Sequence, residues 1–479
     1  MKKYIYLSLG FFIVASFFSV GYFHPDEHFQ ILEFAAYKAG KIPASSLPWE
    51  FAAGMRSGLQ PFIAFYIIKF LALIKIVNPF YQVFFLRLFS GMINFFTILY
   101  LYKGLRKKDS LRLFKEPVFV KGYVLLAFLS WYIFFLGVRF SSESYGMALI
   151  ALGVAFWLNN KPLWLVGLIM GFGFLCRFQT AFMIAGFGLY LIIIEQKHKQ
   201  AIHFATGLLA AFLMGCMIDH WLYDHWVLPA YNYFFQNIVA GKAATFGTYP
   251  WYFYIVRTLG FAIPPYSIFL IVCVFAFFYF YPKHWVSFIL IPFLLAHFIV
   301  AHKEMRFIFS VLHFLPFVII AVLVKIKEDP AYKKVHRFLS AASKWALPLM
   351  ITVNCILLCI TSFTTINFSI PAQQYFWNNY KSGDIIYCLQ KSPYTEGDAT
   401  TTFYQKNSID IHILTSDSLL PNHDITKTVF VVARPDYIFS NPDKYILCYQ
   451  SLPGWIVKYM NFNHWVERSA TWRIYKQGP

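Results

Sequence analysis

Charged residues are scarce in this chain of 479 residues. Asp, Glu, Lys and Arg make up 13% of it, whereas a soluble protein carries about 25%. So little charge cannot cover a surface that faces water, which excludes an ordinary soluble protein, and the high apolar content excludes a disordered one. Most of the surface is therefore expected to face lipid.

Several local patterns are also missing. None of the seven cysteines lies in a CxxC motif or in the Cys/His spacing of a zinc site. No HExxH occurs, which argues against a zinc protease, and there is no internal repeat. His24, Asp26 and His28 are possible metal ligands, so a divalent metal is not excluded, although no metal site and no cofactor are expected.

Long apolar runs are abundant. Hydrophobic residues make up 59% of the chain and aromatic residues 21%. A run of about 20 apolar residues can cross a membrane, and we expect about eleven transmembrane helices, of which the first is an uncleaved signal anchor. The runs lie near 4–23, 82–102, 120–138, 144–159, 162–176, 178–194, 201–219, 253–280, 285–301, 307–324 and 345–363.

The basic residues test this topology. The chain has 41 Lys and Arg against 22 Asp and Glu, a net charge of +19. If each run crosses once, the basic segments 103–121, 195–200 and 325–344 all lie on the side of Lys2 and Lys3, as the positive-inside rule requires. The excess charge is thus explained by cytoplasmic loops, and nucleic acid is not expected as a partner.

The same topology defines the domains. Residues 1–364 form a transmembrane core with a first outer loop at 24–60 and a second at 220–252, and Lys69 and Lys75 mark 60–78 as an interfacial helix. Residues 365–479 form a small outer α/β domain, because short β-rich segments alternate there with Pro, Asn and Asp. These segments lie at 384–390, 409–414, 427–433 and 444–450.

Polar motifs gather at the outer ends of the runs. The first loop begins HPDEHFQ, which puts Asp26 and Glu27 beside the membrane, although they could also be solvated loop acids. Ionised residues at such a depth are costly unless they are paired or functional, yet a single Arg could simply reach lipid head groups. Four further motifs, WEF with RSGLQP, RFSSES, CRFQTA and HKEMRF, indicate a cationic pocket for an anionic lipid phosphate.

HKEMRF gives the most detailed expectation. Lys303 and Arg306 are three residues apart, so on a helix they share a face and can grip one phosphate. Glu304 is then expected to face another way and to hold Arg139 or Arg177. The aromatic-rich loop 220–252 is expected to be ordered over the site.

These motifs together resemble the lipid-phosphate-mannose-dependent α-mannosyltransferases, glycosyltransferase family 22 of the GT-C superfamily, and most of all the GPI mannosyltransferase III branch. HPDEHFQ is similar to the family's HPDE motif, and HKEMRF to its HKE-x-RF motif. The resemblance implies an all-α polytopic membrane protein of GT-C type. It further implies an inverting transfer of mannose from a polyprenyl or dolichyl phosphate β-mannose to a lipid-linked or surface glycan, forming an α-mannoside.

The resemblance also implies residue roles. Asp26 would be the catalytic base, with Glu27 orienting it or the acceptor. The donor phosphate and sugar would be bound by Arg306, Lys303, His302, Arg177 and Arg139. Acceptor-binding or loop-supporting roles would fall to His24, Trp49, Glu50, Arg56, Asp219, Tyr223, Asn237 and Trp251.

Alternatives stay open at this point. A GT-C transferase of another sugar is one, and a flippase or transporter of lipid-linked saccharide is another. A bacterial plasma membrane with an outward-facing site is favoured over an endoplasmic reticulum membrane with a luminal site. Cys388 and Cys448 are either bridged or free. The sequence predicts no particular protein partner.

Overall fold

The structure, a computed structural model, describes residues 1–109, 111–397, 399–406, 409–421 and 428–477. These residues form two compact units. Unit 1 comprises 1–17, 50–63 and 85–363, and unit 2 comprises 18–49, 64–84 and 364–479. The tail therefore shares its unit with most of the first outer loop.

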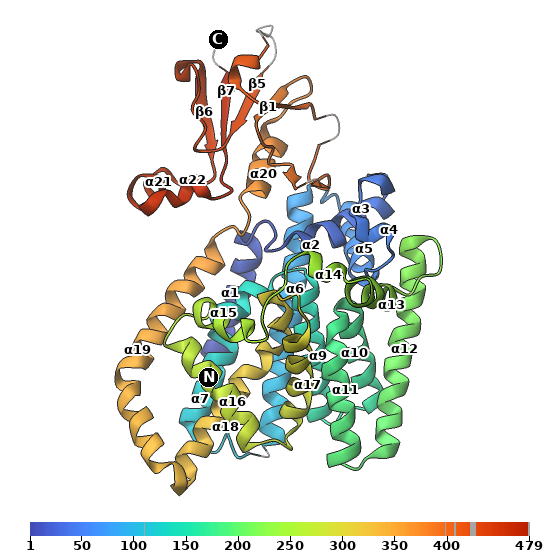
Figure 1. Cartoon of the computed structure of the whole chain (residues 1–479), viewed down its shortest axis with the longest axis vertical. Helices are drawn as coiled ribbons and strands as arrows, with labels where there is room; N and C mark the ends of the chain where they lie inside the picture. The colour runs from blue at the N-terminus through green and yellow to red at the C-terminus, as the bar shows by residue number, and fades with distance from the viewer. Residues whose placement is uncertain (110, 398, 407–408, 422–427, 478–479) are drawn as a thin grey trace. The chain divides into compact units, whose positions relative to one another are not determined.

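Unit 1 is helical, as predicted (Figure 1). Its long helices follow the apolar runs of the sequence. They are α1 (Lys2–Phe18), α6 (Pro79–Lys107), α7 (Pro117–Leu129), α8 (Trp131–Gly137), α9 (Ser142–Leu158), α10 (Leu163–Cys176), α11 (Ala181–Leu189), α12 (His198–Tyr223), α16 (Tyr266–Phe280), α17 (Trp285–Ile299), α18 (Leu315–Glu328) and α19 (Lys333–Phe363).

Small residues let two of these helices approach closely. α10 and α12 run side by side (Figure 1). A Cβ on Gly207 of α12 would lie 1.9 Å from the carbonyl oxygen of Trp164, and one on Gly167 would lie 2.0 Å from that of Phe204. Glycine is thus required at both positions for this packing, which is typical of membrane helices.

Among the described residues, five helices are long and apolar enough to cross a membrane. They are Pro79–Lys107, Pro117–Gly137, His198–Tyr223, Met305–Glu328 and Pro330–Phe363, and the pair α16–α17, bent by 120°, gives a sixth if it counts as one span. The multi-pass character is confirmed, but the number eleven is not. The predicted runs 144–159, 162–176 and 178–194 are shorter apolar helices, at Ser142–Leu158, Leu163–Cys176 and Phe178–Ile194. The helix predicted at 60–78 to be interfacial is α5 (Leu59–Leu73), whose 15 residues extend about 22 Å.

The apolar run 253–280, which was expected to cross once, is not one continuous helix. Pro264 and Pro265 interrupt the run, because proline lacks the N–H that a helix interior needs. The segment is instead α15 (Phe253–Phe261) followed by α16. The preceding loop contains α13 (Pro229–Phe234), a π-helix at Phe235–Val239 and α14 (Lys242–Thr245).

Unit 2 contains the predicted small α/β fold. In the described residues its five-stranded sheet has the order β4-β1-β5-β7-β6, from β4 (Ile411–Leu414), β1 (Ile385–Leu389), β5 (Val429–Ala433), β7 (Arg473–Gln477) and β6 (Tyr445–Gln450). β4, β1 and β5 are parallel, and β7 is antiparallel to its neighbours. Residue 427 of the predicted segment 427–433 lies outside the described residues, and β7 was not predicted.

The apolar strands β1 and β5 are fully buried at the centre of this sheet, as continuous apolar runs of parallel strands usually are. α20 (Ser369–Asn379) packs Phe376 against Ile386 and Phe430. Further helices of the unit are α2 (Pro25–Glu27), a π-helix at His28–Leu32, α3 (Glu33–Lys38), α21 (Gly454–Tyr459) and α22 (Trp465–Arg468), and β2 (Thr395–Glu396) pairs with β3 (Ala399–Thr400).

A disulfide between Cys388 and Cys448 is excluded. Both cysteines are free. Cys388 lies in β1 and Cys448 in β6, and β5 and β7 lie between these strands. With neighbouring strands about 4.8 Å apart, the two Cα atoms are separated by about 14 Å, which is twice the reach of a disulfide of about 7 Å.

Candidate functional site

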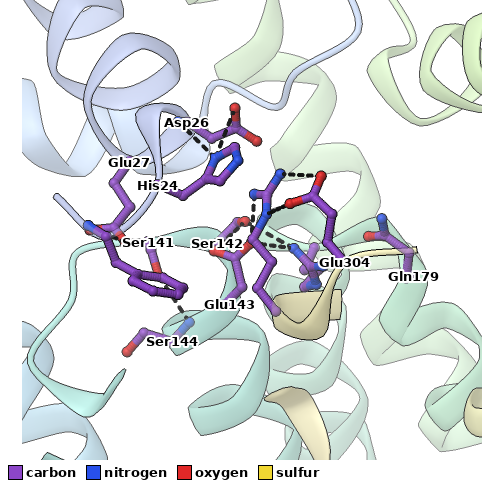
Figure 2. A network of polar contacts seen from close by, with 12 residues as sticks. His24, Asp26, Glu27, Ser141, Ser142, Glu143, Ser144, Gln179 and Glu304 are labelled. Atoms are coloured by element: carbon purple, nitrogen blue, oxygen red, sulfur yellow. Dashed lines mark hydrogen bonds and ion pairs between the residues drawn. The ribbon is translucent and has the colours of Figure 1, made fainter. Parts of the chain in front are cut away.

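A buried acid joins two arginines in unit 1. Glu143 lies in the first turn of α9, where the helix dipole favours a carboxylate and Ser141 caps the helix. Its Oε1 accepts hydrogen bonds from Nη1 of Arg177 at 2.8 Å and from Nη1 of Arg306 at 3.0 Å. All three side chains are at most 9% exposed. Figure 2 shows this network.

Glu304 completes the network from the other side of Arg306. Nε of Arg306 donates to Oε2 of Glu304 at 2.7 Å, and Nη2 donates to Oε1 at 3.2 Å. Nε2 of His302 lies 3.2 Å from the same Oε1. Glu304 thus pairs with Arg306, not with Arg139 or Arg177 as expected, and Glu143, which was not predicted, joins the arginines.

The prediction that Lys303 and Arg306 share one face of a helix is also wrong. The 3-10 helix η6 begins at Met305 and ends at Phe314, so Lys303 precedes it in an extended loop. The Lys303 ammonium donates to the carbonyl oxygen of Val300, and burial lowers its pKa. Lys303 thus braces the loop and adds positive charge, but it does not point along η6 with Arg306.

Arg177 has unused hydrogen-bonding capacity. It caps the end of α10, and its Nη1 donates to Glu143 and to Oγ of Ser142 at 3.3 Å. Its Nε and Nη2 are buried and have no hydrogen-bond partner among the described residues. Such donors are costly to bury. Phe307 lies beside both guanidinium groups, 5.4 Å from that of Arg177 and 5.3 Å from that of Arg306.

The net charge of this cluster is positive. Arg139, two residues before the cap of α9, is 1% exposed. Arg177, Lys303 and Arg306 are three cations, and Glu143 and Glu304 are the two carboxylates that pair with the arginines. An anion would therefore be attracted to these residues, and the planar guanidinium groups suit a phosphate.

The second loop is tied to HKEMRF. Nδ1 of His302 donates to the carbonyl oxygen of Gly247 at 2.8 Å, and the N–H of Tyr249 donates to that of Ala301 at 2.9 Å. His302 thus positions the loop. Two of the aromatic residues of the loop lie at the surface, since Trp251 is 63% exposed and Trp226 is 70% exposed.

Asp219 and Tyr223 at the end of α12 support the first loop. Oδ1 of Asp219 accepts from the N–H of Gly58 at 2.6 Å, and the hydroxyl of Tyr223 donates to the carbonyl oxygen of Arg56 at 2.7 Å. Nη2 of Arg56 lies 3.7 Å from Oε1 of Glu50. These contacts agree with the loop-supporting roles proposed for the four residues.

Two side-chain amides make further contacts near this loop. Asn232 donates to the carbonyl oxygens of Ala53 and Gly54, and Nε2 of Gln179 donates to the hydroxyl of Tyr233 at 2.6 Å. Asn237, by contrast, bonds within its own helix, to the carbonyl oxygen of Tyr233.

The HPDE motif lies in unit 2 and forms the short helix α2. Pro25 occupies the first turn, and Nδ1 of His24 accepts from the N–H of Asp26 at 3.2 Å as a helix cap. The Asp26 carboxylate lies 3.4 Å from the same nitrogen and is 23% exposed. Oε1 of Glu27 accepts from the N–H of Phe23 at 3.3 Å. Trp49 is 37% exposed.

His28 forms its hydrogen bond with a different residue, Glu33. Its Nε2 donates to Oε1 of Glu33 at 2.7 Å, and both side chains are almost fully buried. Burial alone would raise the pKa of Glu33, but hydrogen bonds from His28, Thr402 and Phe403 outweigh it and lower the pKa. Within the described residues, no group of three or more His, Cys, Asp and Glu side chains is arranged to hold a metal ion.

Unit 1 also contains an apolar cavity. Its volume is about 240 Å³, and it lies among α8, α15, α16, α17 and η6. The lining includes Tyr132, Tyr266, Phe298, Met305 and Phe309. Met305, which belongs to the motif HKEMRF, is one of the lining residues, whereas none of the four cations of the outer motifs lines the cavity.

Comparison with known proteins assigns the family. A model of the Alg9-like mannosyltransferase family matches residues 4–382. The chain is 24% identical to "Mannosyltransferase APTG1" of Arabidopsis thaliana, with 65% of this chain and 56% of the relative aligned. It is 25% identical to "GPI alpha-1,2-mannosyltransferase 3" of Danio rerio, with 65% and 57% aligned. It is also 25% identical to "GPI mannosyltransferase 3" of Candida albicans, with 63% and 60% aligned.

The chain thus spans somewhat more than half the length of these relatives. No solved structure matches it. The family match covers the HPDE loop, the arginine cluster and the aromatic loop together, in the order in which the motifs occur. The chain belongs to the Alg9-like mannosyltransferase family.

Proposed function

We propose that the protein is an inverting α-mannosyltransferase that moves mannose from a polyprenyl or dolichyl phosphate β-mannose to a glycan acceptor. One observation carries most of this proposal: the buried Nε and Nη2 of Arg177, whose Nη1 pairs with Glu143, have no acceptor among the described residues. Unit 1 also contains an apolar cavity. A lipid phosphate sugar offers what these features need, since its phosphate accepts hydrogen bonds and its isoprenoid chain fills apolar space.

The reaction needs one base and no covalent intermediate. The Asp26 carboxylate takes the proton from an acceptor hydroxyl, whose oxygen attacks C1 of the mannose while the bond from C1 to the phosphate oxygen breaks. The bonding electrons leave with the lipid phosphate. Arg177 and Arg306 stabilise the charge that develops there, so the leaving group needs no proton.

The roles of the other residues follow from their contacts. Glu143 and Glu304 hold the arginines in fixed orientations, which reduces the reorganisation needed during the reaction. His24 caps the helix that carries Asp26, and Glu27 orients the acceptor. Arg139 and Lys303 add positive charge, and Asp219, Tyr223, Glu50 and Arg56 shape the first loop.

The acceptor and compartment extend the proposal further. The name of the Danio rerio relative specifies an α-1,2 linkage, so a 2-hydroxyl of a lipid-anchored mannoside is the first acceptor to test. The site faces the side opposite to Lys2 and Lys3. The relatives named above are eukaryotic and give no support to a bacterial source, so a luminal site is proposed equally with an outward-facing one.

A transfer assay tests the function. The purified full chain in lipid nanodiscs is given a synthetic lipid-anchored α-mannoside and one of three labelled donors: dolichyl phosphate mannose, dolichyl phosphate glucose or GDP-mannose. Label is expected in the glycolipid only with dolichyl phosphate mannose. Label from the glucose donor would change the sugar assignment, and label from GDP-mannose alone would overturn the lipid phosphate assignment.

A further inference from the structure

Glu33 in unit 2 is a buried acid that the proposed reaction does not use. It is the first residue of α3, seven residues after Asp26, and it is 2% exposed. Its Oε1 accepts from the N–H of Thr402 at 2.6 Å and from that of Phe403 at 3.0 Å. Its Oε2 accepts from the hydroxyl of Thr402. With His28, three residues saturate this carboxylate.

These bonds join the HPDE loop to the C-terminal part of the chain, 369 residues away. A second connection lies at the other end of the loop. The carbonyl oxygen of Val20 accepts from the N–H of Ile366 at 3.0 Å and from the hydroxyl of Thr365 at 2.8 Å. The loop is thus fixed to the tail at residue 20 and at residue 33, and Asp26 lies between the two fixed points.

Aromatic packing strengthens the connection at residue 33. The His28 ring stacks on Tyr404, with ring centres 5.6 Å apart and an angle of 17°. Tyr404 in turn stacks on Phe80 at 4.8 Å. The hydroxyl of Tyr22 donates to Oε2 of Glu396 at 3.1 Å. A carboxylate held this rigidly restricts the rotation of α2 relative to the tail.

We propose that Glu33 is a positioning residue, whose bonds to Thr402 and Phe403 make the C-terminal domain a brace that holds the Asp26 loop in its reactive geometry. This inference rests on the proposed role of Asp26. The tail would then serve the chemical step and not only the folding of the chain. A misplacement of about 1 Å can cost about a hundredfold in rate, so loosening one fixed point is expected to lower turnover strongly.

The test compares two buried acids of unit 2. Glu33→Gln replaces an oxygen that faces N–H donors with an NH₂ group. Asp417→Asn is the matched control, because Asp417 is 7% exposed and accepts from Tyr437 and Ser440 within the tail, away from the loop. Turnover, donor KM and amide hydrogen exchange are measured on the full chain in nanodiscs. Thr402→Val, which removes only the hydroxyl donor, is a milder variant if Glu33→Gln does not fold.

Glu33→Gln is expected to lower kcat about tenfold or more with donor KM within about twofold, and to speed exchange in residues 22–38. Thr402→Val should change kcat and the exchange rate in the same direction but by less. Asp417→Asn should leave kcat and the exchange rate unchanged. Unchanged exchange in residues 22–38 would overturn the brace, as would an equal loss of kcat in Asp417→Asn. Full turnover in Asp26→Asn would instead overturn the assignment of Asp26 as the base. The hydrogen exchange of residues 22–38 would still test the positioning role of Glu33.

Discussion

Asp26 is the residue on which the proposed chemistry depends most. Asp26→Asn is expected to lower kcat by at least about a hundredfold, because an amide cannot take the acceptor proton. Donor KM should change little, since the donor phosphate contacts arginines. The comparison is with Asp443→Asn, an exposed acid of the tail. A turnover within a few-fold of the wild type would remove Asp26 from the role of base.

Arg177 provides the sharpest test of the phosphate site, because two of its donor nitrogens, Nε and Nη2, are buried without partners among the described residues. Arg177→Lys keeps the charge but loses the planar fork, so we expect donor KM to rise by about ten- to a hundredfold, the worth of one hydrogen bond to a charged group. Arg306→Lys should act in the same direction. Arg257→Lys, on the exposed side of α15, is the control. Equal donor KM in all three variants would contradict a phosphate role.

At the scale of elements, the apolar cavity predicts a dependence on lipid length. Val274 lines the cavity, whereas Val272 on the same helix is 59% exposed and does not. Val274→Trp should raise KM for a long-chain dolichyl donor and leave KM for a short-chain donor unchanged, because only the long chain needs the filled space. Val272→Trp should change neither value. An equal rise in KM for both donors would show that the substitution disturbs the structure in general, and would contradict a role of the cavity in binding the lipid chain.

The buried carboxylate of Glu33 makes the stability of the folded chain depend on pH. The pKa of Glu33 is lowered below its ordinary value of 4.5, so its contribution to stability is present above about pH 4.5 and is lost as pH falls through the lower, folded-state pKa. Glu33→Gln lacks this contribution at every pH. The difference in Tm between wild type and Glu33→Gln should therefore be constant from pH 7 to about pH 5 and shrink in stronger acid. A difference that grows in acid would contradict the lowered pKa.

The sequence predicted the elements better than the contacts. The length of the apolar runs identified the helices, and short β-rich segments between Pro, Asn and Asp identified β1 and β5. The break at Pro264 was missed because its flanks are both strongly apolar. HKEMRF was expected to be helical throughout, yet the helix begins only at Met305. Spacing arguments assume a regular element, and they fail where an element starts inside the motif.

The candidate site was predictable only in part, for a related reason. Motifs supplied Asp26, Arg177 and Arg306, which carry the resemblance. Glu143 lies in the motif RFSSES, and an acid at the start of an apolar run signals a buried pair. Glu33 has no such signal, because its partners Thr402 and Phe403 are 369 and 370 residues away. Partners at that separation are set by tertiary structure.

At the scale of the whole molecule, the proposal describes one inverting displacement by a membrane enzyme. A β-linked donor should then yield an α-linked product, with no covalent sugar on the protein. A single transfer from dolichyl phosphate β-mannose, carried out by the full chain in nanodiscs, tests this directly when the labelled product is digested with α- or β-mannosidase. The account predicts release of label by α-mannosidase alone and an unchanged protein mass. Release by β-mannosidase, or a protein carrying one added mannose, would contradict it.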